Sequence, residues 1–431
     1  MFKNIQAILQ VMRDIRLPAD KKEELVEKRL KKVLISAYKH VPYYRNMMKS
    51  IGYNPELDYK GLEDLRKFPV TQRQDLKTND SLMFLKEGIC SKNLYSTKTS
   101  GSTGIPLKIF LSNYEQTFRI AKWLRVLFIN HYSIRDKVLS LTGPSRLVES
   151  KTVLQKFGLL RRLVVDSLLP SSEIAEIFIN NKPHVLYGFR SSIDLLVLEL
   201  IKRKIKPEGL NLVLEGGEII HEHDRNLHYQ AFGIYPIEFY GSEEMGVMAF
   251  ETPARDGLHL CDDLTYFEFL DKNNNPVLPG EAGRIVVTDL LGTTMPFIRY
   301  DQGDLAKVTT DCNGKPEKRI SEIIGRDNDY LVLPDGSKKT SYYLSYDIAG
   351  QFDKIWQFKV IQKTKSHYQL IIAASQDYFT KIESQIKDLL NTKFPKSCYF
   401  DLLRVDFIEP DPSGKLQMII SEIKNDKKIV S

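Results

Sequence analysis

The feature that most limits what this chain can fold into is an alternation of short apolar runs and helical patterns between residues 136 and 244. In order, the segments read DKVLSLTG, RRLVVDSL, SSEIAEIFINN, HVLYGF, RSSIDLLVLELIKRK, NLVLEGGE, HEHDRNLHYQAFG and IYPIEFYGSEE. Strands that alternate with helices usually pair in parallel, because each helix carries the chain back to start the next strand. The sequence therefore predicts a largely parallel α/β sheet in this part of the chain.

The chain changes character after residue 257. The runs LTYFEFLD, GRIVVTDL and MPFIRYDQGDLAKV are separated by Asn, Gly and Pro turns and predict an antiparallel β region up to residue 310. A smaller unit follows, with strand-like runs at 356–361 and 368–373 and a helix near 378–394. We place the domain boundary near Gly325–Asp329, which gives an N-terminal domain over 1–325 and a C-terminal domain over 326–431.

The first 130 residues are predicted to be mainly helical. Residues 20–50 follow a helical pattern that Pro42 breaks, a helix restarts after Pro69, and residues 113–130 form another. The chain begins with an amphipathic pattern, because apolar residues recur at helical spacing at Phe2, Ile5, Ile8, Leu9, Met12 and Ile15. Charged residues interrupt this pattern, so we expect a helix docked on the protein body rather than a membrane anchor.

Composition predicts a soluble globular protein and disfavours several other classes. The 431 residues suggest two or three domains, and the net charge of +7, from 62 basic and 55 acidic residues, is too mild to indicate a nucleic-acid partner. Cysteine spacing gives neither a disulfide framework nor a CxxC zinc site, and no apolar run reaches the roughly 20 residues that span a bilayer. We therefore expect a cytoplasmic protein without a transmembrane segment. The four cysteines are Cys90, Cys261, Cys312 and Cys398.

The segment YSTKTSGSTGIPLKIFLS carries the first candidate binding site. Consecutive amides in a glycine-rich turn form a concave anion site and the hydroxyls add donors, which suits the phosphates of a nucleotide. The segment lacks the Gly-Lys-Ser/Thr ending of a Walker loop. The competing interpretation is a polar surface loop, although IPLKIFLS predicts a strand that anchors it. The candidate residues are Thr99, Ser100, Gly101, Ser102, Thr103 and Gly104.

Five segments, taken in this order, resemble the motifs of the adenylate-forming superfamily. They are TSGSTGIP (the phosphate loop), YGSEEMG (Tyr-Gly-x-Thr-Glu), MPFIRYDQGDLA (Arg-Tyr-x-x-Gly-Asp), GRDNDYL (the hinge) and PSGKLQMIIS (the catalytic-lysine loop). HVPYYRN and GLHLCDDLTYFE are similar to the phenylacetate–CoA ligase branch and its CapK-like relatives from capsular polysaccharide loci. The resemblance covers nearly the whole chain. It implies a large N-terminal α/β domain with a β subdomain, and a small mobile C-terminal α+β lid that rotates between half-reactions.

The same resemblance implies an enzyme that uses ATP and Mg²⁺. It would convert a small-molecule carboxylate into an acyl-adenylate with release of pyrophosphate, then transfer the acyl group to an acceptor. CoA, a carrier protein and an amino sugar are the candidate acceptors, and capsular or surface polysaccharide decoration is a candidate purpose. A monomer and a homodimer both fit. The alternative is a catalytically inactive protein that keeps the fold as a binding module or scaffold.

Three residues are implied to act in the chemistry. Lys415 follows a Pro-Ser-Gly turn, as the family's catalytic lysine does, and its ammonium would offset the repulsion between carboxylate and α-phosphate. Glu244 lies four residues after Tyr240, the family spacing for the acid that binds Mg²⁺. Arg326 would reach the ribose or phosphate from the hinge, where Asp329 would be the pivot. A surface lysine and a solvated acid are the competing interpretations.

Three segments are implied to hold the nucleotide. The carboxylate of Asp304 would accept hydrogen bonds from the ribose hydroxyls, and the ring of Tyr240 would pack on the adenine beside a backbone wall. A turn aspartate and a core tyrosine are the competing interpretations. The residues of this predicted site are Gly216, Gly217, Glu218, Tyr240, Gly241, Ser242 and Asp304.

Two positions depart from the superfamily pattern. Glu243 stands where Thr or Ser is usual, so the hydroxyl contact to the α-phosphate would fall to Ser242, and Glu243 becomes a rival to Glu244 as the magnesium ligand. Leu107 stands where many members have lysine. Both departures favour the inactive alternative, whereas the retained lysine and acidic residues favour an enzyme.

A zinc site is a further candidate. Glu251, His259 and Cys261 lie where some relatives hold a metal, but Thr252 replaces the cysteine expected there. Isolated His and Cys residues are more often structural, so that interpretation competes with zinc.

Overall fold

The computed structural model describes residues 2–78, 81–98, 107–144, 147, 153–310, 316–326, 330–340, 348, 351–352, 354–411 and 414–423. These residues form a mixed α/β structure, as predicted, in two compact units. Unit 1 is Met1–His131 with Phe239–Ile323, and unit 2 is Tyr132–Glu238 with Ile324–Ser431. No helix in the described part of the chain is long and apolar enough to cross a membrane.

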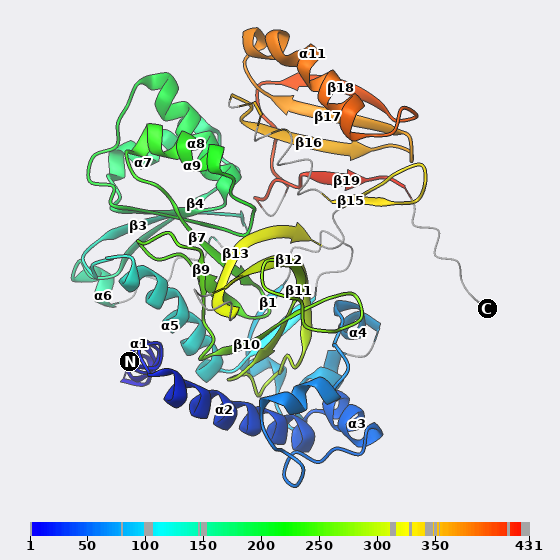
Figure 1. Cartoon of the computed structure of the whole chain (residues 1–431). Helices are drawn as coiled ribbons and strands as arrows, with labels where there is room; N and C mark the ends of the chain where they lie inside the picture. Colours follow the sequence, from blue (N-terminus) through cyan, green and yellow to red (C-terminus); the bar gives the residue numbers. More distant parts are fainter. Residues whose placement is uncertain are drawn as a thin grey trace. The chain divides into compact units, whose positions relative to one another are not determined.

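The first half of unit 2 is a parallel sheet with its crossover helices, which confirms the predicted alternation (Figure 1). Its elements are β3 (Lys137–Thr142), α6 (Val153–Lys156), β4 (Arg161–Asp166), α7 (Ser171–Asn181), β5 (Val185–Gly188), α8 (Arg190–Arg203), β6 (Leu212–Gly216) and α9 (Glu222–Phe232). The strand order is β6-β5-β3-β4, and each of these neighbours pairs in parallel. All four carboxyl ends therefore lie at one edge of the sheet, the edge at which open α/β sheets bind ligands.

The C-terminal part of unit 2 forms a separate small sheet with its own core, as expected from its sequence pattern. Its elements are β14 (Tyr330–Val332), β15 (Lys338–Thr340), β16 (Gln357–Gln362), β17 (His367–Ala373), α11 (Gln376–Lys393), β18 (Tyr399–Val405) and β19 (Ile419–Ser421). The four-stranded order is β18-β17-β16-β19, and α11 buries Phe379, Ile382, Ile386 and Leu390 in its core. The domain boundary at residue 325 stays a prediction.

The strands of unit 1 include the predicted antiparallel region. They are β1 (Tyr95–Lys98), β2 (Lys108–Leu111), β7 (Ile237–Ser242), β8 (Gly246–Phe250), β9 (Leu258–Leu260), β10 (Thr265–Leu270), β11 (Ala282–Asp289), β12 (Tyr300–Thr310) and β13 (Pro316–Arg326). The region predicted over 257–310 forms β9 to β12, whereas β7, the last run of the predicted alternation, pairs antiparallel with β8. The main order is β10-β11-β12-β13-β9-β8-β7, while β1 and β2 pair as a hairpin. The pairing of Lys98 with Lys108 holds together the two ends of the segment that contains the predicted phosphate loop.

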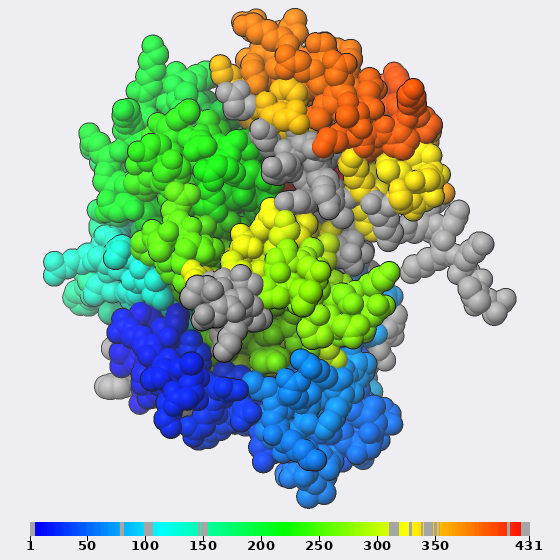
Figure 2. Space-filling view, in the orientation of Figure 1, coloured from blue at the N-terminus to red at the C-terminus, as the bar shows by residue number. Residues whose placement is uncertain are grey.

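The helices of unit 1 precede most of its strands. They are α1 (Phe2–Asp14), α2 (Ala19–His40), α3 (Pro42–Ser50), η1 (Leu62–Lys67), α4 (Arg73–Thr78), η2 (Ser81–Phe84), η3 (Ser91–Asn93) and α5 (Asn113–Ile129). The predicted helix ends before Pro42, but residues 42–50 then form a second helix because proline is compatible with the first helical position. The segment from α1 to α3, in blue, forms a continuous layer of the surface in Figure 2.

Helix α1 docks on the protein body, as predicted. Ala7 and Val11 are buried against Phe118 and Ala121 of α5. Ile5 and Leu9 remain exposed.

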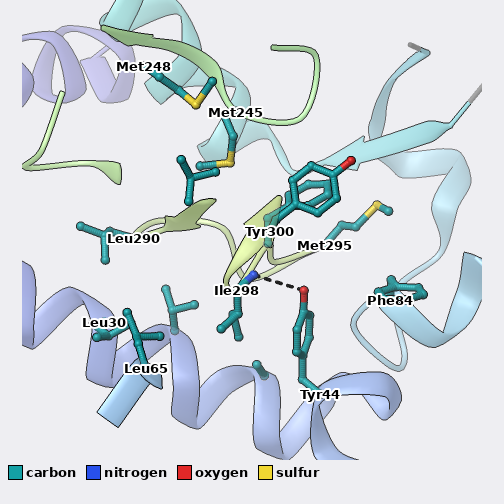
Figure 3. Packing of buried hydrophobic residues seen from close by; sticks show 14 of the residues in the cluster. Leu30, Tyr44, Leu65, Phe84, Met245, Met248, Leu290, Met295, Ile298 and Tyr300 are labelled. Carbon is teal, nitrogen blue, oxygen red and sulfur yellow. Dashed lines mark hydrogen bonds between the residues drawn. The ribbon is translucent and has the colours of Figure 1, made fainter. Parts of the chain in front are cut away.

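The main core of unit 1 packs the N-terminal helices against the antiparallel strands (Figure 3). Leu30 of α2 and Tyr44 of α3 are fully buried in it with Ile298 and Tyr300. The hydroxyl of Tyr44 accepts a hydrogen bond from the Ile298 amide at 3.2 Å. The core therefore fixes the start of β12, which carries the predicted site residue Asp304.

A buried ionic network ties three helices of unit 1 to one turn. The guanidinium of Arg125 donates to both carboxylate oxygens of Asp263, at 2.8 and 2.6 Å, and both side chains are fully buried. Arg29 of α2 donates to the backbone carbonyl of Asp263 and to the carboxylate of Asp14, each at 2.6 Å. Because a buried charge is costly without its partner, this network depends on every member.

We expect Asp263→Asn to lower the free energy of unfolding of unit 1 by about 3–5 kcal/mol, because it leaves Arg125 buried without a countercharge. Urea unfolding followed by Trp123 fluorescence in a Trp356→Phe background measures this change. Glu24→Gln, which breaks the exposed pair between Lys21 and Glu24, is the matched control and should have no measurable effect. An Asp263→Asn variant as stable as its parent would contradict a structural role for the network.

Candidate active site

The hairpin loop between β7 and β8 carries two adjacent acids, Glu243 and Glu244. Helix α5 fixes the backbone of this loop, because Arg119 donates to the carbonyls of Glu243, at 2.7 Å, and of Glu244. The ammonium of Lys122 donates to the next carbonyl, that of Met245, at 3.0 Å. Lys122 is buried, and burial lowers its pKa. Three successive carbonyls are thus held by two basic side chains on one helix, which makes the loop a rigid support for the acids.

The two acids have different surroundings. Glu244 is buried, and its carboxylate accepts a hydrogen bond from Tyr300 at 3.1 Å and lies 3.9 Å from the Arg73 guanidinium. Burial and the neighbouring Glu244 raise the pKa of Tyr300, so its hydroxyl stays a donor. Glu243 is half-buried and accepts a hydrogen bond from Thr97 of β1 at 2.7 Å. Glu244 is therefore the acid held in a charged, preorganised setting, while Glu243 contacts the strand before the predicted phosphate loop.

Asp304 lies in an irregular stretch of β12. Arg284 and Val286 of β11 are two residues apart, but their partners on β12, Leu305 and Asp301, are four residues apart. Strand β12 therefore bulges between these two pairs. Such bulges redirect side chains and are common beside active sites. The half-buried Asp304 accepts a hydrogen bond from the Tyr240 hydroxyl at 2.7 Å. The structure thus brings together two residues that the sequence analysis assigned to one nucleotide.

Asp301 shapes the bulge before Asp304. It accepts a hydrogen bond from Arg284 at 2.6 Å and from the amide of Gly303 at 2.8 Å. Gly303 has a φ of 73°, which glycine adopts readily. The turn that presents Asp304 therefore depends on the side chain of Asp301 and on the backbone freedom of Gly303.

In unit 2, Lys415 belongs to a tight turn that we call the Lys415 loop (Asp411, Gly414, Lys415 and Leu416). Its backbone bonds run from the Asp411 amide to the Lys415 carbonyl and from the Gly414 amide to the Asp411 carbonyl, both at 2.8 Å. The Asp411 carboxylate accepts a bond from the Lys415 amide at 3.2 Å. The turn is therefore organised by its own hydrogen bonds.

The Lys415 loop lies against the carboxyl ends of the parallel strands. Gly414 has a φ of 84°, and a Cβ on it would lie 2.5 Å from the Ser167 hydroxyl after β4 and 3.6 Å from Gly143 after β3. The Lys415 ammonium lies 5.0 Å from the ring centroid of Phe189, after β5. A Cβ on Gly217, after β6, would lie 3.3 Å from that ammonium. The cation is thus held at the edge where α/β sheets bind ligands.

Glu218 joins the Lys415 loop to helix α8. Its carboxylate accepts hydrogen bonds from the Leu416 amide at 2.6 Å, from the Ser191 amide at 2.8 Å and from the Ser191 hydroxyl at 2.9 Å. Burial raises the pKa of Glu218, while Arg190 acts in the opposite direction. The sequence predicts Glu218 only as part of a backbone wall, and the structure adds this use of its side chain.

A buried charged cluster lies behind Glu218. Arg190 pairs with Asp194 and lies 3.4 Å from Asp224, and His228 lies 2.7 Å from Asp194 and 2.6 Å from Glu215. Burial alone would lower the pKa of His228, but the two carboxylates outweigh it and raise that pKa to about 10. His228 is therefore a cation at neutral pH. The alternating charges connect α8, α9 and the end of β6 beneath the Lys415 loop.

The predicted site residues fall into two groups. Tyr240, Gly241, Ser242, Glu244 and Asp304 belong to unit 1, and Gly216, Gly217, Glu218, Arg326 and Lys415 belong to unit 2. Arg326 is half-buried at the end of β13. The predicted phosphate-loop residues, 99–104, and the predicted pivot, Asp329, lie outside the described residues.

Four residues near the predicted site were not predicted from the sequence. Tyr300 and Arg73 accompany Glu244, and Arg119 and Lys122 hold the acidic loop. Tyr300 lies inside the quoted Arg-Tyr-x-x-Gly-Asp segment, so its position was a usable signal. The others come from helices that carry no motif.

Within the described ranges, no group of three or more His, Cys, Asp or Glu residues could hold a metal ion by itself. His259 instead contacts Asp256 at 2.8 Å, and burial raises the pKa of the Cys261 thiol. Glu244 fits Mg²⁺ only as one oxygen ligand, with the remaining ligands supplied by a bound nucleotide and water.

Comparison of the sequence with known proteins gives a consistent result. The family profile "CapK C-terminal domain" matches residues 331–422. The phenylacetate-coenzyme A ligase of Thermus thermophilus is 26% identical over 92% of this chain and 87% of its own length. Protein CapK of Staphylococcus aureus is 21% identical over 84% of this chain and 81% of its own length.

Solved structures share the fold. A crystal structure of 2-hydroxyisobutyryl-CoA ligase in the postadenylation state, in complex with R3-HIB-AMP, matches with a TM-score of 0.78 at 19% identity, covering 94% of this chain and 91% of that one. An open conformation of that ligase in complex with 2-HIB-AMP and CoA matches with a TM-score of 0.65 at 19% identity, covering 94% of this chain and 92% of that one. At this identity the likeness concerns the fold.

We expect Gly414→Ala to undock the Lys415 loop, because the new Cβ would overlap the Ser167 hydroxyl. Limited trypsin digestion followed by mass spectrometry should show cleavage after Lys415 several-fold faster than in the parent. Gly336→Ala is the matched control, because Gly336 has a similar φ of 85° but open space around its Cα, so it shares the backbone strain without the clash. Equal cleavage after Lys415 in both variants would contradict the docked position.

Proposed function

This chain belongs to the adenylate-forming superfamily, in its phenylacetate-coenzyme A ligase and CapK family, and we propose that it activates a small carboxylate for transfer to CoA or a related acceptor. It is an AMP-forming enzyme of the phenylacetate-coenzyme A ligase type. In the proposed first step, a carboxylate oxygen attacks the α-phosphate of ATP and pyrophosphate leaves. In the second, the acceptor attacks the acyl carbon and AMP leaves.

The observation that carries this proposal is the position of Lys415. Two anions meet in the first step, so the site must supply a cation that is already in place. The Lys415 ammonium lies over the Phe189 ring and passes Gly217, at the carboxyl ends of β5 and β6. A preorganised ammonium there would stabilise the negative charge that gathers on the reacting oxygens.

The pair of Tyr240 and Asp304 supports the nucleotide part of the proposal. Asp304 would accept hydrogen bonds from the two ribose hydroxyls while the Tyr240 hydroxyl orients its carboxylate at 2.7 Å. Glu244, held by Tyr300, would give Mg²⁺ one oxygen ligand, and this ion would neutralise phosphate charge. Arg326 would reach the ribose or phosphate, and residues 99–104 would bind phosphate oxygens.

The acceptor and the purpose are proposed from the relatives. A crystal structure of 2-hydroxyisobutyryl-CoA ligase includes CoA, which supports CoA as the acceptor. The CapK profile and the similarity to Protein CapK support a role in capsular or surface polysaccharide decoration, where the acceptor would be an amino sugar or a carrier protein. A cytoplasmic location suits either acceptor.

We expect Asp304→Ala to weaken ATP binding by about 10- to 150-fold, because hydrogen bonds to a charged group are lost. Isothermal titration calorimetry with ATP and Mg²⁺ measures the affinity. Asp377→Ala, on the exposed first turn of α11, is the control and should bind as the parent does. An unchanged affinity in a folded Asp304→Ala variant would remove Asp304 from the ribose site.

We expect Lys415→Ala to slow carboxylate-dependent exchange of pyrophosphate into ATP by about 10²–10³-fold, while ATP affinity stays within about threefold. A panel of aryl, branched-chain and amino acids should first identify the carboxylate that the parent accepts. Lys381→Ala, exposed on α11, should keep the parent rate. Exchange at the parent rate in Lys415→Ala would overturn the catalytic role, and no exchange with any acid in the parent would favour the inactive scaffold.

A further inference from the structure

We propose that Glu218 is the positioning residue that holds the Lys415 loop in place for adenylate formation and releases it for acyl transfer. This inference rests on the proposed function, and it adds a role for a side chain that the resemblance assigns only to a backbone wall. Glu218 touches no reacting atom in this account. It acts through Leu416, the residue that follows the catalytic lysine.

The hydrogen bonds of Glu218 link three segments that are far apart in the sequence. Its Oε1 accepts from the Leu416 amide at 2.6 Å and from the Ser191 hydroxyl at 2.9 Å, and its Oε2 accepts from the Ser191 amide at 2.8 Å. Ser191 and Leu416 are both buried. The end of β6, the first turn of α8 and the Lys415 loop therefore meet at one carboxylate.

The Leu416 bond is short, and the Glu218 carboxyl group accepts each of the three hydrogen bonds described above, as an ionised carboxylate does. A second hydrogen bond to the same loop, from the Ser192 hydroxyl to the Gly414 carbonyl, is 3.4 Å long. A hydrogen bond to a charged group is about twice as strong as a neutral one. Losing the Leu416 bond should lower the ratio of docked to undocked loop by about 10- to 150-fold.

The same arrangement allows the loop to leave intact. Its internal bonds between Asp411, Gly414 and Lys415 do not involve Glu218, so the turn keeps its shape when the Leu416 bond breaks. Glu218 keeps two bonds to Ser191, so its carboxylate stays in position to take the loop back. The Leu416 bond is therefore the shorter of the two hydrogen bonds that dock the loop, and it is the one that Glu218 provides.

The contact itself is tested by hydrogen–deuterium exchange on peptides that cover residues 411–420. We expect the Leu416 amide to exchange at least tenfold faster in Glu218→Ala than in the parent. Glu218→Gln keeps one acceptor oxygen and should give an intermediate rate. Glu208→Gln, which alters an exposed acid paired with Lys182, should match the parent. Equal exchange of the Leu416 amide in the parent and Glu218→Ala would overturn the proposal.

The functional consequence is tested by measuring the two half-reactions separately. We compare the rate of pyrophosphate exchange with the rate of acyl transfer from supplied acyl-adenylate. In Glu218→Ala the ratio of the first rate to the second should fall by about 10- to 100-fold relative to the parent. The fall should come from a lower kcat of exchange, while KM for ATP stays within about twofold. Partial rescue is expected in Glu218→Gln. An equal loss in both half-reactions, or a loss confined to KM for ATP, would overturn the positioning role in favour of a structural or nucleotide-binding one. If the parent shows no exchange with any acid, the proposed function fails, while the hydrogen-exchange comparison still decides the contact.

Discussion

The arrangement of unit 2 depends on one constraint, that the Lys415 ammonium is held against the ends of a parallel sheet by the backbone of its own loop. A lysine on a long flexible stem loses considerable side-chain entropy when it is held in place. Here the backbone around it is ordered first, by the Asp411 turn and by the bond from Leu416 to Glu218. The close packing of Gly414 on Ser167 then sets the height of the loop above the strands. The ammonium is thereby placed by the backbone that carries it.

In unit 1, the loop between β7 and β8 holds two adjacent acids in place. Glu243 and Glu244 are adjacent, and like charges at this spacing would spread a loose loop. Arg119 and Lys122 donate hydrogen bonds to three successive carbonyls of the loop, so two side chains of α5 hold the backbone that carries the acids. Tyr300 donates a hydrogen bond to the carboxylate of Glu244, and Thr97 donates one to the carboxylate of Glu243. This division favours Glu244 over Glu243 as the ligand for a metal ion bound with a nucleotide.

Much of the fold could be predicted from the sequence because it follows local patterns. The alternation that begins at residue 136 encodes the parallel strands β3 to β6, and the Asn, Gly and Pro turns after residue 257 encode antiparallel ones. Lys415, Asp304 and Tyr240 could be named because short motifs surround them. The side-chain roles of Glu218, Arg119 and Lys122 could not, because their partners lie 198, 124 and 123 residues away in the sequence and no local spacing records such contacts.

The central claim is that a carboxylate oxygen bonds to the α-phosphate of ATP, and isotope transfer tests it directly. The parent enzyme is given ATP, Mg²⁺, CoA and its accepted carboxylate labelled with ¹⁸O in both oxygens, and the AMP is analysed by mass spectrometry. Our account predicts one ¹⁸O atom in the phosphate of each AMP, because the bridging oxygen stays on phosphorus when the acyl group is transferred. Unlabelled AMP, or ADP as the nucleotide product, would contradict it.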